Sequence, residues 1–224
     1  AFRHVQSGGT EVRLANLDVR LPNGSALLHA QGISAHPGER VLVTGPSGAG
    51  KTTLLRAIAG IWPFGEGEIA LPEQARLMIL PQRPYIPAGR LDAALSYPAE
   101  PEAYERAQFE DVLTAVGLPA LVLRLEEAAA WPHVLSLGEQ QRLSIARVLL
   151  VRPDVLLLDE ATAALDEPLE ARLYALIAQR LPKVVLLSIG HRSTLVALHD
   201  TALALEGAQS PRTLAASRLA PAAA

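Results

Sequence analysis

The stretch Gly45-Pro46-Ser47-Gly48-Ala49-Gly50-Lys51-Thr52-Thr53 decides the fold of this chain. It fits the pattern G-x-x-x-x-G-K-[ST] and lies between a predicted strand, Arg40–Thr44, and a predicted helix that runs from Thr52 to about Ile61. In that setting the glycines let the backbone curl, so that successive amides and the helix N-terminus point at phosphate oxygens. Lys51 is predicted to neutralise the β- and γ-phosphates, and the Thr52 hydroxyl to bind Mg²⁺. The stretch therefore predicts a binding site for a triphosphate and its magnesium ion.

Two adjacent carboxylates, Asp159 and Glu160, follow the apolar run Val155–Leu158. Because adjacent residues of a strand point to opposite sides, the two side chains cannot have the same role. Asp159 is predicted to hold Mg²⁺ through water, and Glu160 to face the γ-phosphate and polarise the attacking water. Alone, the segment favours a strand followed by a solvated acidic loop. Together with the phosphate loop it predicts a P-loop NTPase.

Composition limits the other possibilities. Half of the 224 residues are hydrophobic, which indicates a folded globular chain. The formal net charge of −3 gives no broad attraction for nucleic acid, so we expect no nucleic-acid partner. The absence of cysteine excludes disulfides and thiolate metal sites. No apolar run is long enough to predict a membrane-spanning helix.

Strands alternate with helices along the chain, which predicts an α/β fold. A turn at Pro22-Asn23-Gly24 predicts a hairpin between a strand over Glu11–Leu21 and a second strand through Leu27-Leu28. Further strands are predicted at Arg76–Leu80, Val155–Leu158 and Val184–Ser188, and helices at Glu102–Val116, Glu139–Leu150 and Leu169–Leu181. We expect a single domain over residues 1–224: a core with a β subdomain at about 10–83 and 152–207, a helical subdomain at about 84–151, and a loose tail over 208–224.

The segment Leu135-Ser136-Leu137-Gly138-Glu139-Gln140-Gln141-Arg142 resembles the signature of ABC-type ATPases, commonly L-S-G-G-Q-x-Q-R. Leu137 and Glu139 depart from that pattern, whereas Ser136 and Gly138 are retained. The resemblance implies that Ser136 and Gly138 contact the γ-phosphate held by an opposite subunit, and that Glu139 belongs to the same nucleotide-binding segment. Ser136 and Glu139 also fit a helix capping box, and both interpretations hold together.

The remaining motifs of that family follow in order. Gln82 matches the Q-loop glutamine, Ala164-Leu165-Asp166 resembles the D-loop that contacts the partner subunit, and His191 matches the switch histidine. The resemblance implies a RecA-like core with an antiparallel β subdomain and an inserted helical subdomain, acting on ATP with Mg²⁺. It assigns catalysis to Glu160, His191, Gln82 and Lys51, nucleotide contacts to residues 45–53, Ser136, Gly138, Glu139 and Asp166, and the metal to Thr52, Gln82 and Asp159.

Finer strings, among them Leu80–Ile86 and Gly190–Leu195, resemble peroxisomal family D transporters and, more closely, bacterial BacA/SbmA-like members with a fused ATPase. This resemblance implies a homodimer, a permease domain fused N-terminally and a place on the cytoplasmic face of a bacterial inner membrane. The missing initial methionine fits a piece of a longer protein. An ATPase subunit that docks on a separate permease, a non-transport ABC ATPase and a regulatory module without hydrolysis are the alternatives. Residues 21–25 lack the aromatic side chain that often stacks on adenine, which predicts loose base selectivity.

Overall fold

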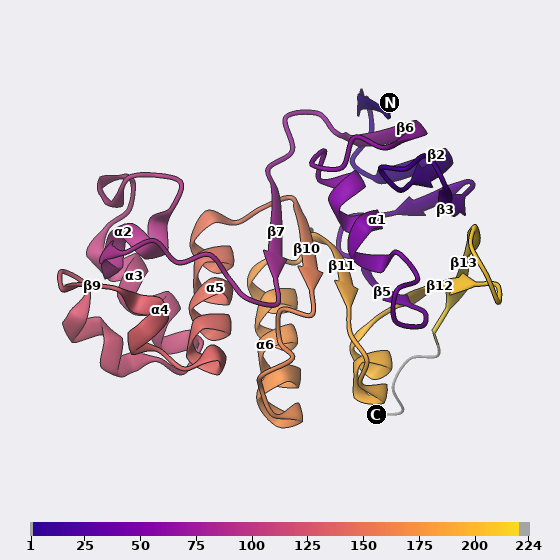
Figure 1. The fold of residues 1–224 in the computed structure, drawn as a ribbon. Helices are drawn as coiled ribbons and strands as arrows, with labels where there is room; N and C mark the ends of the chain where they lie inside the picture. The colour runs from indigo at the N-terminus through magenta and orange to yellow at the C-terminus, as the bar shows by residue number, and fades with distance from the viewer. Residues whose placement is uncertain (1, 220–224) are drawn as a thin grey trace. The chain divides into compact units, whose positions relative to one another are not determined.

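The computed structural model describes residues 2–219, which form two compact units (Figure 1). The sheet unit takes in the described residues of Ala1–Ile79, Pro153–Asp159 and Pro182–Ala224. The helical unit takes in Leu80–Arg152 and Glu160–Leu181. Each unit contains residues from segments that are far apart in the sequence, so neither is a simple N- or C-terminal half.

The sheet unit is built on one mixed sheet. Its strands, in spatial order, are β1 (Arg3–Ser7), β6 (Gly65–Pro72), β2 (Val12–Arg20), β3 (Ala26–Ala30), β13 (Arg212–Arg218), β12 (Thr201–Glu206), β5 (Arg40–Thr44), β11 (Val185–Ile189), β10 (Val155–Asp159) and β7 (Leu77–Pro81), with β4 (Ile33–Ala35) paired to β2. Strand β5 pairs in parallel with β11 and β12, and β10 pairs in parallel with β11, whereas β2 is antiparallel to β3, β4 and β6. The predicted α/β fold and the predicted hairpin, now β2–β3, are confirmed.

Burial explains why the central strands read as continuous apolar runs. All five residues of β11 and the first four of β10 are buried, as expected for parallel strands covered on both faces. Helix α1 (Lys51–Ile58) contributes Leu54, Leu55 and Ile58 to the same core, each with no exposed surface. Burying such a side chain stabilises the folded state by about 1.5–3 kcal/mol. The core therefore fixes the helix that follows the phosphate loop.

The expected loose tail is wrong for residues 212–218. These form β13, which pairs antiparallel with β12 over six residue pairs and in parallel with β3 over three. The segment is rich in Ala, Ser and Arg, so its side chains carry little strand signal. Its backbone groups are satisfied on both sides, and this pairing orders it. Residues 220–224 of the expected tail lie outside the described residues.

The helical unit contains β8 (Gly89–Arg90), α2 (Leu91–Ser96), η1 (Pro101–Ala103), α3 (Arg106–Ala115), η2 (Pro119–Arg124), β9 (Ala128–Ala129), α4 (Trp131–Val134), α5 (Leu137–Val151) and α6 (Glu167–Arg180). The predicted subdomain bounds differ from the two observed units, because the segment that forms α6 was expected in the core and not in the helical subdomain. In the structure α6 contacts α5, and the Arg180 guanidinium forms two bonds of 2.7 and 3.0 Å to the Asp111 carboxylate on α3. These contacts join α6 to the helical unit.

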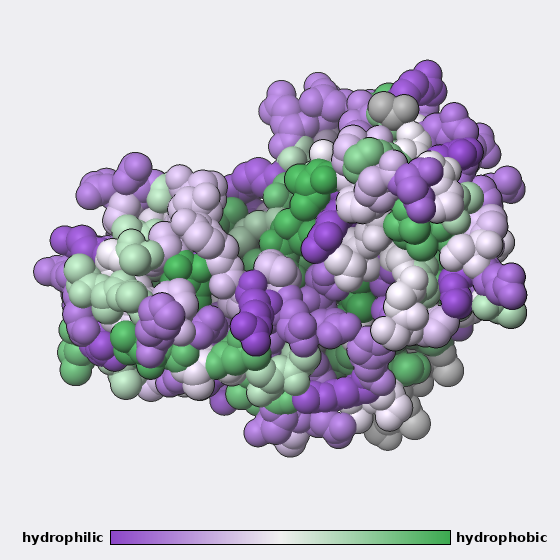
Figure 2. Space-filling model, in the orientation of Figure 1, coloured by the Kyte–Doolittle hydropathy of each residue, from purple (hydrophilic) through white to green (hydrophobic). Residues whose placement is uncertain are grey.

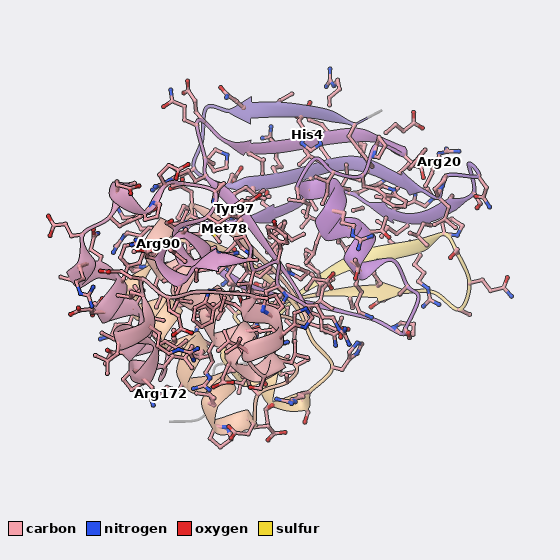
Figure 3. The ribbon with its side chains drawn as sticks, turned by 60° about the vertical axis from the view of Figure 1, so that its left-hand side comes forward. His4, Arg20, Met78, Arg90, Tyr97 and Arg172 are labelled. Carbon is pink, nitrogen blue, oxygen red and sulfur yellow. The ribbon has the colours of Figure 1, made fainter. Side chains whose placement is uncertain are left out.

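The surface carries both hydrophilic and hydrophobic side chains. In the view of Figure 2, hydrophobic side chains occur in separate groups among hydrophilic ones. Figure 3 shows His4 on the edge strand β1 and Arg20 at the end of β2.

Within residues 2–219, no helix combines the length and the apolar character that crossing a bilayer requires. The η3 turn (Ser193–Leu198) completes the sheet unit between β11 and β12.

Candidate nucleotide-binding site

The phosphate loop connects β5 to α1 in the sheet unit. Gly45, Gly48 and Gly50 have φ values of 142°, 73° and 97°, a region that side chains with a Cβ atom rarely adopt. A Cβ atom on Gly50 would also lie 2.9 Å from the Leu27 side chain. Glycine at these positions is therefore required by the backbone and, at Gly50, by packing. The loop curls as the sequence pattern predicts.

Lys51, the first residue of α1, forms hydrogen bonds back to the phosphate loop. Its Nζ donates hydrogen bonds of 2.8 and 3.0 Å to the carbonyl oxygens of Gly45 and Pro46, and the residue is only 7% exposed. The ammonium group therefore lies beside the phosphate loop, the segment whose amides precede α1. This places one positive charge next to the positive end of a helix dipole, which is an arrangement suited to a phosphate chain.

Thr52 and Asp159 meet although 107 residues separate them. The Thr52 hydroxyl, in the first turn of α1, donates a hydrogen bond of 3.0 Å to Asp159 Oδ1 at the end of β10. Hydroxyl and carboxylate oxygens are the hard ligands that Mg²⁺ prefers, usually with several waters retained. The two predicted metal ligands of the sheet unit therefore have suitable chemistry and are held close together.

His191 also belongs to the sheet unit and lies two positions after Ile189, the last residue of β11. Gly190, between them, packs against Leu195 so closely that an added Cβ atom would overlap the Leu195 side chain. Close packing therefore requires glycine at position 190, and His191, which is exposed, lies just beyond the end of a central parallel strand. Binding residues of parallel sheets commonly occupy this strand end.

Glu160 begins the second segment of the helical unit with an unusual backbone. Its φ is 53°, in the left-handed region that costs a residue with a Cβ atom roughly 1–2 kcal/mol. Its carbonyl accepts a hydrogen bond of 3.1 Å from the Ala163 amide, which forms the turn that leads to α6. Strained residues occur frequently at active sites. The strain is therefore consistent with the catalytic role predicted for Glu160.

Ser136 caps the N-terminus of α5. The capping box predicted from the sequence is therefore confirmed. The Glu139 amide donates to Ser136 Oγ at 3.3 Å, and Ser136 donates to Glu139 Oε2 through its hydroxyl (2.7 Å) and its amide (2.9 Å). Hydrogen bonds from the Ser136 hydroxyl and amide, with the charge of Arg142 nearby, lower the pKa of the Glu139 carboxyl. A carboxylate is thus held at the helix end where the resemblance implies a phosphate contact.

The helical unit brings two further predicted segments together around one glutamine of α5. The Gln141 side chain donates to the Gln82 carbonyl and accepts from the Ala164 amide, both at 2.9 Å. Asp166 caps α6 by accepting from the Leu169 amide at 2.8 Å. We predicted no role for Gln141, because its partners are backbone atoms that carry no side-chain signal in the sequence.

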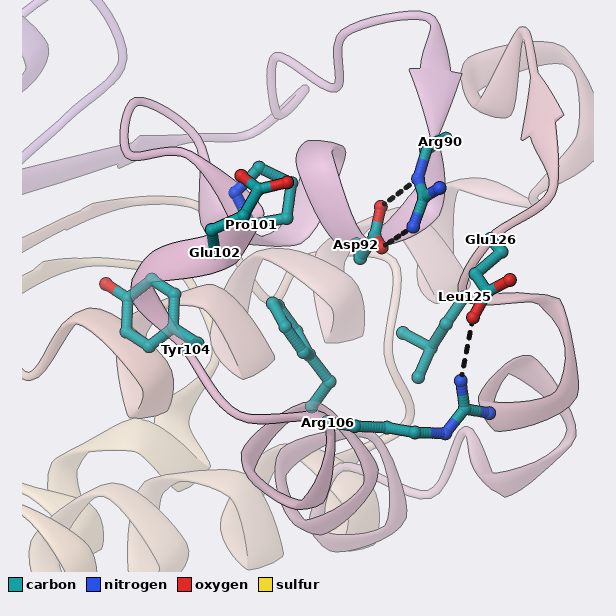
Figure 4. Close-up of a pocket in the computed structure, with 9 residues that line it drawn as sticks. Arg90, Asp92, Pro101, Glu102, Tyr104, Arg106, Leu125 and Glu126 are labelled. Atoms are coloured by element: carbon teal, nitrogen blue, oxygen red, sulfur yellow. Dashed lines mark hydrogen bonds and ion pairs between the residues drawn. The ribbon is translucent and has the colours of Figure 1, made fainter.

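A cavity of about 210 Å³ lies elsewhere in the helical unit (Figure 4). Two ion pairs border it, Arg90 with Asp92 and Arg106 with Glu126. Because each arginine is already bonded to a carboxylate, these charges do not mark an anion site. None of the residues that line the cavity is a predicted nucleotide ligand.

Comparisons with known proteins agree with this geometry. The family model described as ABC transporter matches residues 28–163. An uncharacterized ABC transporter ATP-binding protein of Haemophilus influenzae is 46% identical over 88% of this chain and 33% of its own length. ABC transporter D family member 1 of Arabidopsis thaliana is 34% identical over 92% of this chain and 16% of its own. A solved bacterial Atm1-family ABC exporter with ATP bound has a TM-score of 0.77 at 27% identity, covering 88% of this chain and 37% of that one.

The fold and the phosphate-loop geometry define a nucleotide-binding ATPase domain of the mixed α/β class. The chain belongs to the ABC transporter family and is similar to its ATP-binding proteins. It spans about a third of the length of the Haemophilus relative. The resemblance inferred from the sequence, including the likeness to family D transporters, is confirmed.

Proposed function

We propose that this domain hydrolyses ATP with Mg²⁺ at a composite site formed by two copies arranged head to tail. Residues 45–53 bind the phosphates, with Lys51 on the β- and γ-phosphates, while Thr52, Gln82 and Asp159 hold the metal. Magnesium supplies charge neutralisation at the γ-phosphate when it is bound. Glu160 polarises the attacking water, and His191 supports the γ-phosphate. The observation that carries the proposal is the pairing of Thr52 with Asp159 beside the Lys51 loop.

The signature residues complete the site in the opposite copy. Ser136, Gly138 and Glu139 lie at the N-terminus of α5. Ser136 and Gly138 contact the γ-phosphate of the partner, Glu139 lies in the same nucleotide-binding segment, and Asp166 contacts the partner subunit. A helix of 15 residues provides amides and a dipole for this purpose. Hydrolysis then removes the phosphate that joins the copies, and the dimer opens. The rate gain comes mostly from positioning and charge stabilisation.

At the level of the fold, we assign the sheet unit to a RecA-like core with an antiparallel β subdomain, and the helical unit to the inserted helical subdomain. At the level of the whole protein, the domain powers solute transport by a permease fused N-terminally, from the cytoplasmic face of the membrane. Support comes from relatives about three times as long as this chain, one of them an inner membrane ABC transporter ATP-binding protein, YddA, of Escherichia coli.

Phosphate release tests the enzymatic part of the proposal. The domain is incubated with ATP and Mg²⁺, alongside Lys51→Ala and the same protein in excess chelator. We expect release by the unaltered chain and a loss of at least a hundredfold in both controls, because Lys51 and the metal neutralise the charge that develops on the phosphates. Release at the same rate from Lys51→Ala would contradict the assignment.

A further inference from the structure

Gln141 has a buried side chain whose two polar ends are both used. The residue has no exposed surface and lies in the second turn of α5. Its Nε2 donates to the Gln82 carbonyl oxygen, and its Oε1 accepts from the Ala164 amide, each at 2.9 Å. A carbonyl can only accept and an amide N–H can only donate, so the two partners fix which end of the side chain is oxygen. The bonded residues are 59 and 23 positions away in the sequence.

These bonds connect three segments to which the proposed function gives separate tasks. Gln82 is the proposed metal and water contact, and Ala164 precedes Asp166, the proposed partner contact, by two residues. The third segment is the start of α5 itself. A Cβ atom on Gly138 would lie only 3.5 Å from the Ala164 carbonyl oxygen and from the Leu165 side chain. All three segments belong to the helical unit.

We propose that Gln141 is a positioning residue for ATP hydrolysis, which couples the Gln82 segment, the Ala164–Asp166 turn and the start of α5 through one side-chain amide. This inference rests on the proposed function. A displacement of any one segment then moves the other two, so that the γ-phosphate contacts from one copy and the partner contacts form together. The amide is suited to this task because it offers a donor and an acceptor at the same reach.

Removal of the amide is expected to affect geometry more than folding. Gln82 and Ala164 are exposed residues, so the two lost hydrogen bonds lie in surface segments and not in the hydrophobic core. Without these two bonds the segments lose their fixed spacing. Small misplacements in an active site reduce the rate by up to about a hundredfold. Binding of ATP depends on the phosphate loop of the sheet unit, which Gln141 does not contact through either hydrogen bond.

Two variants of Gln141 test the coupling. Gln141→Met keeps the length and removes both bonds, and it should lower kcat ten- to a hundredfold with the KM for ATP changed by less than about twofold. Gln141→Glu keeps the acceptor for Ala164 but loses the donor when ionised. The kcat of Gln141→Glu should therefore also fall, because the bond to Gln82 is lost while the bond to Ala164 is kept.

The matched control is Gln179→Met, at an exposed glutamine of α6, which should leave kcat unchanged. Hydrogen exchange gives a readout that does not depend on activity: the Ala164 amide should exchange at least tenfold faster in Gln141→Met. A normal kcat in Gln141→Met, a normal kcat in Gln141→Glu, or unchanged exchange at Ala164 in Gln141→Met would each overturn the inference. Absence of phosphate release from the unaltered protein would instead contradict the proposed function, and the exchange measurement would still test the bridge.

Discussion

The Thr52 hydroxyl donates a hydrogen bond of 3.0 Å to Asp159 Oδ1, and this bond joins the first turn of α1 to the end of β10. Both elements are fixed by the buried core of the sheet unit, since Leu54, Leu55 and Leu157 have no exposed surface. The packing of the core therefore holds together two oxygen atoms that are suited to bind Mg²⁺.

Substitution of Thr52 should change the magnesium requirement. Thr52→Val keeps the shape but removes the hydroxyl, so we expect the Mg²⁺ concentration at half-maximal phosphate release to rise about tenfold or more. Thr52→Ser keeps the oxygen and should stay within about threefold of the unaltered protein. Titration of Mg²⁺ at saturating ATP measures both. Equal magnesium curves for Val and Ser would remove Thr52 from the metal site.

Glu139 should oppose ATP-driven association. Its carboxylate lies at the end of α5 that is proposed to meet a phosphate, and hydrogen bonds from Ser136 lower its pKa and so favour the anionic form. Glu139→Gln removes the repulsion and still accepts the capping bonds, so the ATP concentration needed for dimers should fall several-fold. Light scattering against ATP concentration measures this. A variant that needs as much ATP as the unaltered chain, or more, would contradict the phosphate contact.

The backbone of Glu160 should cost stability. Glu160→Gly and Glu160→Ala both remove the carboxylate, but only glycine adopts a φ of 53° without strain. We expect the free energy of unfolding to be about 1 kcal/mol higher for the glycine variant than for the alanine variant. Urea unfolding compares the two directly. If the alanine variant is the more stable, the conformation of residue 160 does not store strain.

His199 should make stability depend on pH. Burial lowers its pKa from 6.5 to about 4, and its Nδ1 lies 2.6 Å from the Leu195 carbonyl oxygen. Between those pH values the unfolded chain binds more protons, so stability is full above pH 6.5 and falls by up to about 3 kcal/mol as the pH approaches 4. Urea unfolding at pH 7 and pH 5 measures the loss. His199→Gln, which does not titrate, should show a smaller loss, and an equal one would assign the effect to other groups.

Much of the fold could be predicted because side chains carried the signal. The run Val155–Leu158 is buried on both faces of the sheet, so its apolar character revealed β10. Ser136 and Glu139 have the spacing of a capping box, and the structure forms it. Both features are local or depend on burial, which periodicity reports.

Features that depend on distant backbone atoms or on the conformation of a single residue could not be predicted. Strand β13 is held by hydrogen bonds to β12 and β3, while its sequence resembles a loose tail. The helix expected over Glu102–Val116 is interrupted, because Glu105 adopts an extended conformation and caps α3 in a box with Gln108. Gln141 lies in the signature segment, but its role could not be predicted, since that role depends on two distant main-chain atoms.

The central claim is that this chain supplies half of a composite ATP site. It is tested most directly by the oligomeric state of Glu160→Gln in Mg-ATP, measured by size exclusion with light scattering and compared with the same protein in Mg-ADP. Without the carboxylate that polarises the water, the γ-phosphate should persist between two copies, so the account predicts a stable dimer in ATP and a monomer in ADP. A variant that binds ATP but stays monomeric, or that hydrolyses it at the normal rate, would contradict the account.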